Sequence, residues 1–295
     1  MPAGEHLKSY IGGDLDLYLF LQGYNPTGAF KDRGMTVLFS WGEMSGVEEY
    51  VGRSTGDTSA SGSAYGTKAG RTVYTLLPKG KITGIQGVQV PLFRGLPAMF
   101  DTDFDGLEKP FWYLVKVKGL YPLNSVNPTR ISGHKTTVFR IAQFFTWGNM
   151  PRVIGCSVGN GSNSASLDEG LKDLVAYGMK NVETRILGCQ SEMAAPLSAS
   201  WEQVFGICNL SGLTHETQLT VWRDTYRPVR VGKTDATASA IGNPASRDKV
   251  MRAIVRTNGH MVTVTESELN EARHVCASDG IDVCNQSGIA LAGLK

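Results

Sequence analysis

Stretches typical of β-strands alternate with stretches typical of helices along nearly the whole chain, and this alternation is what most restricts the fold. Strands are predicted at 15–22, 71–78, 97–101, 184–191 and 260–265, and at the start of the segments 121–133, 152–166 and 281–294. Helices are predicted at 30–46, 54–70, 82–95, 105–117, 134–145, 246–259 and 265–280. Residues 198–235 show no clear helix or strand pattern. The alternation predicts an α/β protein with mainly parallel sheets, whose sites lie at the carboxyl ends of the strands.

The composition argues against several classes of protein. With 29 basic and 27 acidic residues the net charge is +2, so charge gives no reason to expect binding to nucleic acid or to an anionic membrane. The five cysteines form no CxxC pair, so we expect no disulfide framework, no zinc or other metal site, and a reducing, cytoplasmic compartment. No apolar stretch is long enough to span a membrane, and the N-terminus lacks the pattern of a signal or transit peptide.

Lys31 is the first candidate for chemistry. It stands in "NPTGAFKDRG", residues 25–34, after a tight turn and before a predicted helix. A lysine amine held there out of water can act as a nucleophile toward a carbonyl compound, because desolvation lowers its pKa. The alternative is an ordinary solvated lysine in the first turn of a helix.

Two further segments contain groups that suit an anion. "VGNGSN", residues 158–163, lies between a strand and a helix, where small residues and a helix N-terminus can cradle a phosphate. "NSVNPTR", residues 124–130, ends in Arg130, whose guanidinium beside amide and hydroxyl donors suits a phosphate or a carboxylate. The alternatives are a plain tight turn for the first segment and a surface arginine for the second.

Two segments offer hydroxyl groups at the start of a predicted helix. In "STGDTSA", residues 54–60, hydroxyls and early-helix amides converge in one turn and could hold a carboxylate. In "NQSGIA", residues 285–290, Ser287 stands at a predicted strand end, where a neutral hydroxyl could face a heterocycle nitrogen. For both segments the alternative is a helix N-cap without a ligand.

The order of these segments along the chain resembles that of the pyridoxal-phosphate enzymes of fold type II, the tryptophan-synthase-like fold. Within that group, "NPTGAFKDRGMT", "STGDTSASGSAYGTKAG", "NSVNPTRISGHKT" and "VGNGSN" look like the threonine synthase family, over roughly residues 15–294. The resemblance implies two three-layer α/β/α domains, as in the tryptophan synthase beta chain. The large domain, which binds pyridoxal phosphate, would combine 1–40 with 138–295, and the small mobile domain would be 41–137.

The same resemblance implies a role for each candidate residue. Lys31 would form the Schiff base with pyridoxal phosphate, Phe30 would pack near its ring, and Ser287 would bond the pyridine nitrogen. The other cofactor-binding residues would be Asp57, Gly159, Asn160, Gly161, Ser162 and Asn163. The substrate carboxylate would be held by Ser54, Thr55 and Thr58, and the substrate phosphate by Asn124, Ser125 and Arg130.

The implied activity is that of a lyase acting on a small phosphorylated substrate: O-phospho-L-homoserine and water would give L-threonine and phosphate. The first alternative is a related threonine or serine dehydratase, or another phospho-amino-acid lyase. Arg130 argues against a dehydratase, because the substrate of a dehydratase has no phosphate for the arginine to bind. Asp57 replaces an asparagine common in relatives, and family members have further chain at both ends. A degenerate, non-catalytic homologue that keeps the fold is therefore a second alternative. The sequence leaves the oligomeric state open, with a homodimer as one option.

Overall fold

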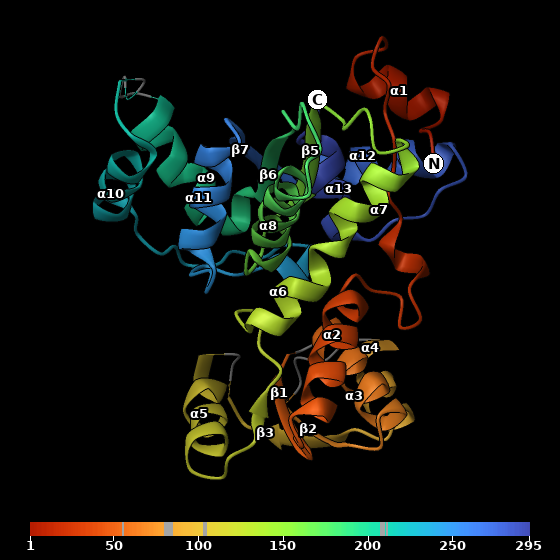
Figure 1. Cartoon of the computed structure of the whole chain (residues 1–295), viewed down its shortest axis with the longest axis vertical. Helices are drawn as coiled ribbons and strands as arrows, with labels where there is room; N and C mark the ends of the chain where they lie inside the picture. Colours follow the sequence, from red (N-terminus) through yellow and green to blue (C-terminus); the bar gives the residue numbers. More distant parts are fainter. Residues whose placement is uncertain (55, 80–84, 103–104, 207–209, 211) are drawn as a thin grey trace. The chain divides into compact units, whose positions relative to one another are not determined.

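The computed structural model describes residues 1–54, 56–79, 85–102, 105–206, 210 and 212–295, without the side chains of 85–87 and 105. The chain divides into two compact units: the smaller unit is 21–136, and the larger unit is 1–20 together with 137–295. Each contains a parallel sheet, as the alternation of elements predicted (Figure 1). Residues 21–40, expected in the large domain, lie in the smaller unit because the helix that begins at Lys31 packs on two other helices of that unit.

The smaller unit is built on four parallel strands in the order β3–β2–β1–β4, namely β1 (Glu49–Arg53), β2 (Thr72–Pro78), β3 (Leu96–Phe100) and β4 (Tyr121–Pro122). Its helical elements are η1 (Gln22–Tyr24), α2 (Lys31–Met44), α3 (Asp57–Lys68), α4 (Ile85–Leu92), η2 (Asp105–Leu107), α5 (Glu108–Lys116) and α6 (Pro128–His134). Successive strand residues point to opposite faces. Tyr50 packs in a cluster with α2, whereas Val51 packs in a cluster with α5, so helices cover both faces of the sheet.

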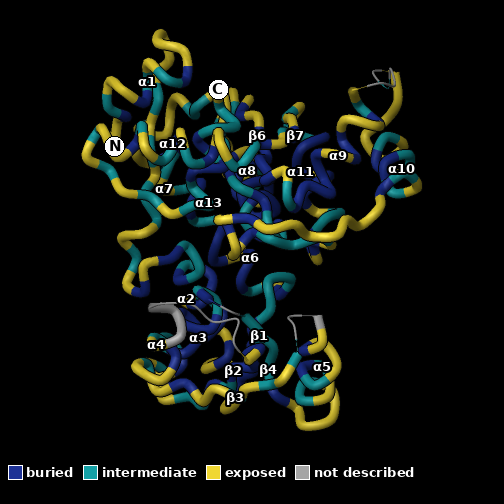
Figure 2. The backbone as a smooth tube through the Cα atoms, turned by 180° about the vertical axis from the view of Figure 1, so that it is seen from behind, coloured by how far each residue is buried: buried dark blue, intermediate teal, exposed yellow. Residues whose placement is uncertain are grey.

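The larger unit has three parallel strands in the order β5–β6–β7, namely β5 (Val153–Ser157), β6 (Arg185–Ser191) and β7 (His260–Val264). Its helical elements are α1 (Glu5–Ile11), α7 (Thr136–Phe144), α8 (Ser162–Ala176), η3 (Glu192–Ala194), α9 (Pro196–Trp201), η4 (Glu202–Gly206), α10 (His215–Thr225), η5 (Thr237–Ser239), α11 (Arg247–Arg256), α12 (Glu266–Ser278) and α13 (Asn285–Ala292). Ile186 packs with α8 and α11, whereas Cys189 packs with α12 and α13. This unit is therefore also three-layered, and Figure 2 shows buried residues along its strands and inner helices.

Two of the predicted strands are wrong. Residues 15–22 form only an isolated bridge between Tyr18 and Pro2, with backbone hydrogen bonds to the first residues of the chain. Residues 281–284 contain no strand. In both places short apolar runs bury side chains instead of joining a sheet: Leu17, Leu19 and Ile281 all pack against the cluster formed by α1, α12 and α13.

Two elements that the sequence analysis missed shape the smaller unit. The first is β1 itself, and the second is α6, which follows the strand predicted at the start of 121–133. The signal for α6 was present in "NPT": Asn127 caps the helix by accepting the Thr129 N–H, and Pro128 occupies the first helical position. The helix predicted at 265–280 forms α12, and a capping box begins it, in which Thr265 and Glu268 bond each other reciprocally. Among the described residues, no helix combines the length and apolarity that a membrane span requires.

Candidate functional site

The turn before Lys31 is fixed by a buried carboxylate. Asp32, only 2% exposed, accepts hydrogen bonds from the Thr27 N–H at 2.8 Å and from the Thr27 hydroxyl at 2.5 Å. It also accepts one at 2.5 Å from the hydroxyl of Ser61 on α3. Gly28, at φ +80°, supplies the left-handed residue that the turn needs. One side chain thus ties together the turn, α2 and α3, which orients the start of α2 where Lys31 stands.

Two glycines let α2 and α6 approach closely. A Cβ at Gly133 would lie 2.1 Å from the carbonyl oxygen of Arg33, and a Cβ at Gly34 would lie 2.6 Å from Nε2 of His134. Neither position has room for a side chain without movement of its neighbours. The crossing therefore places the buried side chains of α6, Arg130 and His134, near the first turn of α2.

The surroundings of Lys31 favour its neutral amine. Its Nζ lies 3.7 Å from the centroid of the Phe30 ring. Desolvation, and then repulsion from Arg130, lower the pKa of Lys31 from 10.5 to about 7, while Asp57 opposes the shift. A substantial fraction of the amine is therefore unprotonated at neutral pH, which is the state that a nucleophile or a base requires.

Arg130 is a fully buried cation whose hydrogen-bonding capacity is largely unused. Its Nη1 donates to the carbonyl oxygen of Leu123 at 3.0 Å, but Nε and Nη2 have no hydrogen-bond partner in the described part of the chain. Burial lowers the pKa of Arg130 from 12.5 to about 10. The buried Oδ1 of Asn124 also lacks a partner there. Because an unpaired buried cation is costly, Arg130 calls for an anionic ligand, whereas the Oδ1 of Asn124 is an acceptor and calls for a donor.

His134 was not among the predicted site residues, although it lies one helical turn after Arg130 in the sequence. It is 0% exposed, and its ring centroid lies 5.1 Å from that of Phe30. Burial, together with Arg130, Lys31 and Arg33, holds the pKa of His134 well below 6.5, so the imidazole is neutral. The sequence hint for His134 was that it stands four residues after Arg130. That spacing places two side chains on the same face only in a helix, and no helix was predicted over 128–134.

The neutral state of Lys31 gives a testable pH dependence. Competitive labelling of the cofactor-free protein with acetic anhydride, read by mass spectrometry, should show Lys31 reactivity rising with pH and half-maximal near pH 7, because only the neutral amine reacts. The exposed Lys68 serves as the internal reference. Half-maximal labelling of Lys31 above pH 10 would show a solvated lysine and contradict the environment described.

The remaining predicted residues of the smaller unit lie around the start of α3 and the end of β4. Ser54 accepts a hydrogen bond from the Gly56 N–H at 3.2 Å, and Asp57 and Thr58 lie in the first turn of α3. Asn124 and Ser125 lie in the segment between β4 and α6, and Thr55 lies outside the described residues. The smaller unit therefore contains the predicted lysine together with the groups proposed for both ends of the substrate.

The predicted phosphate loop in the larger unit joins β5 to α8. Gly159 lies so close to the backbone of Ser239 that a Cβ would be 3.1 Å from its Cα, and Gly161 is the N-cap of α8 at φ +86°. Asn160 accepts a hydrogen bond from the Ala245 N–H at 3.1 Å. The side-chain Oδ1 of Asn163 has no partner in the described chain, and Ser162 begins α8 with a negative φ. No side chain caps this helix, so its first N–H groups are available to an anion.

Ser287 does not lie at a strand end as expected. It is the third residue of α13, where its hydroxyl lies 3.3 Å from Sγ of Cys284. The Ser287 hydroxyl is partly buried, but it is positioned by the first turn of α13 and not by the end of a strand.

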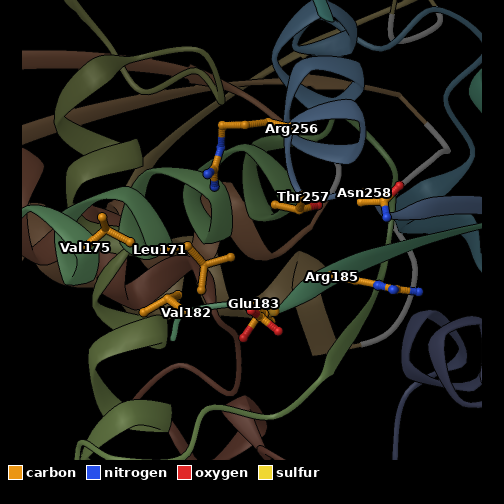
Figure 3. Close-up of a pocket in the computed structure, with 9 residues that line it drawn as sticks. Leu171, Val175, Val182, Glu183, Arg185, Arg256, Thr257 and Asn258 are labelled. Atoms are coloured by element: carbon orange, nitrogen blue, oxygen red, sulfur yellow. The ribbon is translucent and has the colours of Figure 1, made fainter. Parts of the chain in front are cut away.

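A separate pocket of about 290 Å³ lies elsewhere in the larger unit and contains none of the predicted residues. Figure 3 shows it lined by Arg256 and Asn258 at the end of α11 and by Glu183 and Arg185 at the start of β6. Ligands of open parallel sheets bind at the carboxyl ends of the strands. This pocket lies at the opposite end of β6, so we assign it no part in the chemistry.

Comparison with known proteins identifies the class to which these two units belong. Solved structures with the same fold include threonine deaminase isoform 2 from Solanum lycopersicum, with a TM-score of 0.76 and 17% identity, covering 99% of this chain and 77% of that one. Maize serine racemase has a TM-score of 0.75 and 15% identity, covering 100% of this chain and 79% of that one. At such low identity these likenesses establish the fold alone, which is the predicted fold type II architecture.

The sequence comparisons identify the family. The family model described as pyridoxal-phosphate dependent enzyme matches residues 5–295, and the chain belongs to this family. It is 34% identical over 284 residues to the threonine synthase of Methanocaldococcus jannaschii, covering 96% of this chain but 65% of that protein. It is 34% identical over 280 residues to the threonine synthase of Mycobacterium leprae, covering 94% of this chain and 70% of that protein.

The residues present fit the family's cofactor, pyridoxal phosphate. A lysine with a lowered pKa suits its aldehyde, and an uncapped helix start after a glycine-containing loop suits its phosphate. The Ser287 hydroxyl suits a ring nitrogen without forcing it to remain protonated, as a carboxylate would. Which individual residues hold the cofactor stays a prediction.

Proposed function

We propose that this chain converts O-phospho-L-homoserine and water to L-threonine and phosphate, as a lyase that depends on pyridoxal phosphate. The observation that carries the proposal is Arg130, a buried guanidinium with two unpaired nitrogens on the helix that crosses α2 next to Lys31. A substrate phosphate supplies the anion that this group lacks. The similarity to two curated threonine synthases supports the same substrate.

The residues of the smaller unit would divide the work between binding and proton transfer. When bound, pyridoxal phosphate supplies the electron sink that stabilises negative charge on the substrate's carbon atoms. Lys31 would anchor the cofactor and then accept and return protons at Nζ, for which a pKa of about 7 is well matched. Arg130, with Asn124 and Ser125, would bind the phosphate and stabilise the charge that develops on it as it leaves.

The other end of the substrate would be held at the start of α3. Ser54, Thr55 and Thr58 offer hydroxyls for the substrate carboxylate, and Asp57 opposes the loss of charge from Lys31. Phe30, whose ring centroid lies 3.7 Å from Nζ of Lys31, would pack against the cofactor ring. In the larger unit, Gly159 to Asn163 would hold the cofactor phosphate and Ser287 its ring nitrogen.

The proposal extends to the setting of the reaction. The four cysteines in the described part of the chain, Cys156, Cys189, Cys276 and Cys284, are unpaired, which supports a reducing, cytoplasmic compartment. We keep a homodimer as one option for the assembly. We also retain the expectation that the smaller part of the chain moves when substrate binds, since closure excludes water from such reactions.

The experiment that tests the proposal compares three substrates on the protein saturated with pyridoxal phosphate. O-phospho-L-homoserine should yield equimolar phosphate and L-threonine, measured by a phosphate assay and by chromatography. L-Threonine and L-serine should yield little 2-oxobutyrate or pyruvate. Efficient formation of either oxo acid, without phosphate release, would assign the chain to the dehydratases, and no turnover of any of the three would favour the non-catalytic reading.

A further inference from the structure

One buried serine hydroxyl in the larger unit makes no hydrogen bond to the described part of the chain. Ser246 is 2% exposed, and its Oγ has no hydrogen-bond partner among the described residues. It is the N-cap of α11, the position where a serine normally accepts a hydrogen bond from the helix, yet its side chain makes no such bond. Buried polar groups in native proteins are nearly always bonded, so this hydroxyl needs a partner that the described residues do not supply.

Ser246 lies directly against the predicted phosphate loop. Its N–H donates to the carbonyl oxygen of Asn160 at 3.1 Å, and the Ala245 N–H donates to Oδ1 of the same asparagine at 3.1 Å. A Cβ at Gly161, the N-cap of α8, would lie 3.4 Å from Cβ of Ser246. The Cβ of Ser246, which bears the hydroxyl, thus lies beside Gly161 at the start of α8, although the two residues are far apart in the sequence.

Other polar groups where the loop 158–161 meets α8 also lack a hydrogen-bond partner in the described chain. Helix α8 spans fifteen residues and has no side-chain cap, so its first N–H groups and the positive end of its dipole are unshared. The Oδ1 atom of Asn163, in the first turn of α8, is also unpartnered in the described chain, but as an acceptor it can bond a donor and not an anion. The unpartnered buried hydroxyl of Ser246 and the uncapped start of α8 both have donors to offer, and together they indicate an anion site.

We propose that the Ser246 hydroxyl donates a hydrogen bond to the phosphate of bound pyridoxal phosphate, as an additional cofactor ligand contributed by the segment before α11. The inference rests on the proposed function only in placing that phosphate on residues 158–163. It adds a residue from a different part of the chain, one that the local pattern of the glycine loop does not contain.

The test is the dissociation constant of pyridoxal phosphate from the Ser246→Ala protein, measured by titrating cofactor into the cofactor-free protein and following absorbance. We expect binding about tenfold weaker than in the unmodified protein, the usual scale for one hydrogen bond to a charged group. Pyridoxal, which lacks the phosphate, should bind both proteins equally. The cofactor-free Ser246→Ala protein should melt at the same temperature or higher, because an unpaired buried hydroxyl has been removed.

Ser239→Ala is the matched control. Ser239 lies on the other flank of the same loop, with its Cα 3.1 Å from where a Cβ at Gly159 would be, but its hydroxyl already donates to the carbonyl oxygen of Ala236 at 2.9 Å. We expect this change to lower the melting temperature of the cofactor-free protein and to leave the preference for pyridoxal phosphate over pyridoxal intact.

Two outcomes would overturn the assignment of Ser246. One is unchanged affinity for pyridoxal phosphate, and the other is an equal loss for pyridoxal together with a lower melting temperature, which would show a structural role. Asn163→Ala separates this failure from that of the phosphate loop. If Asn163→Ala weakens phosphate-dependent binding and Ser246→Ala does not, the loop holds the phosphate without Ser246. If neither does, and the unmodified protein binds pyridoxal as tightly as pyridoxal phosphate, both assignments fall.

Discussion

Replacing Lys31 with alanine is expected to abolish the visible absorption band that the protein acquires with pyridoxal phosphate and to lower turnover by about 10⁴-fold, near the upper range for loss of a general acid–base group. The reason is that the amine of Lys31 is the group near the start of α2 whose pKa burial brings to about 7. The measurements are an absorption spectrum and the rate of phosphate release from O-phospho-L-homoserine.

Lys68→Ala is the control, since Lys68 is an exposed lysine at the end of α3 in the same unit. Its spectrum and rate should match those of the unmodified protein. A Lys31→Ala protein that still acquires the band would place the attachment point on another lysine. Retained turnover would remove Lys31 from the chemistry altogether, whatever the spectrum shows.

Arg130→Met is expected to reduce kcat/KM for O-phospho-L-homoserine by about 10²–10³-fold while leaving the affinity for pyridoxal phosphate unchanged. The substitution removes the donors Nε and Nη2, which have no partner in the described chain and which we assign to the substrate phosphate. Within the described part of the chain it removes one side-chain hydrogen bond, to Leu123, so the melting temperature should change little or rise. Steady-state kinetics, cofactor titration and thermal melting measure the three effects.

Arg130→Lys sharpens this test, because lysine keeps the charge but loses the planar fork of donors. We expect it to recover only part of the lost activity. The exposed Arg140 on α7, bonded to Gln143, provides an arginine-to-methionine control without effect on kinetics. An Arg130→Met protein with normal kcat/KM but a much lower melting temperature would show that the guanidinium serves the fold.

Local sequence signals were sufficient for much of the fold. The runs at 71–78, 184–191 and 260–265 form β2, β6 and β7, since each is long enough and apolar enough to be buried in a parallel sheet. The short apolar runs at 15–22 and 281–284 misled, because the same side chains can be buried by packing on helices without strand pairing. The asparagine and proline at the start of α6 are typical of a helix N-terminus, but the pattern of apolar residues there did not indicate a helix.

The sequence by itself determined the class of fold, the family and the candidate lysine, because strand and helix periodicity, turn residues and short motifs are local properties of the chain. Only the tertiary structure decided which candidates have the right environment. The crossing of α2 and α6 sets the pKa of Lys31 and leaves Arg130 with unpaired donors, and the packing of α11 on the phosphate loop buries Ser246. Desolvation and hydrogen-bond satisfaction depend on neighbours that are distant in sequence, so no local pattern could report them.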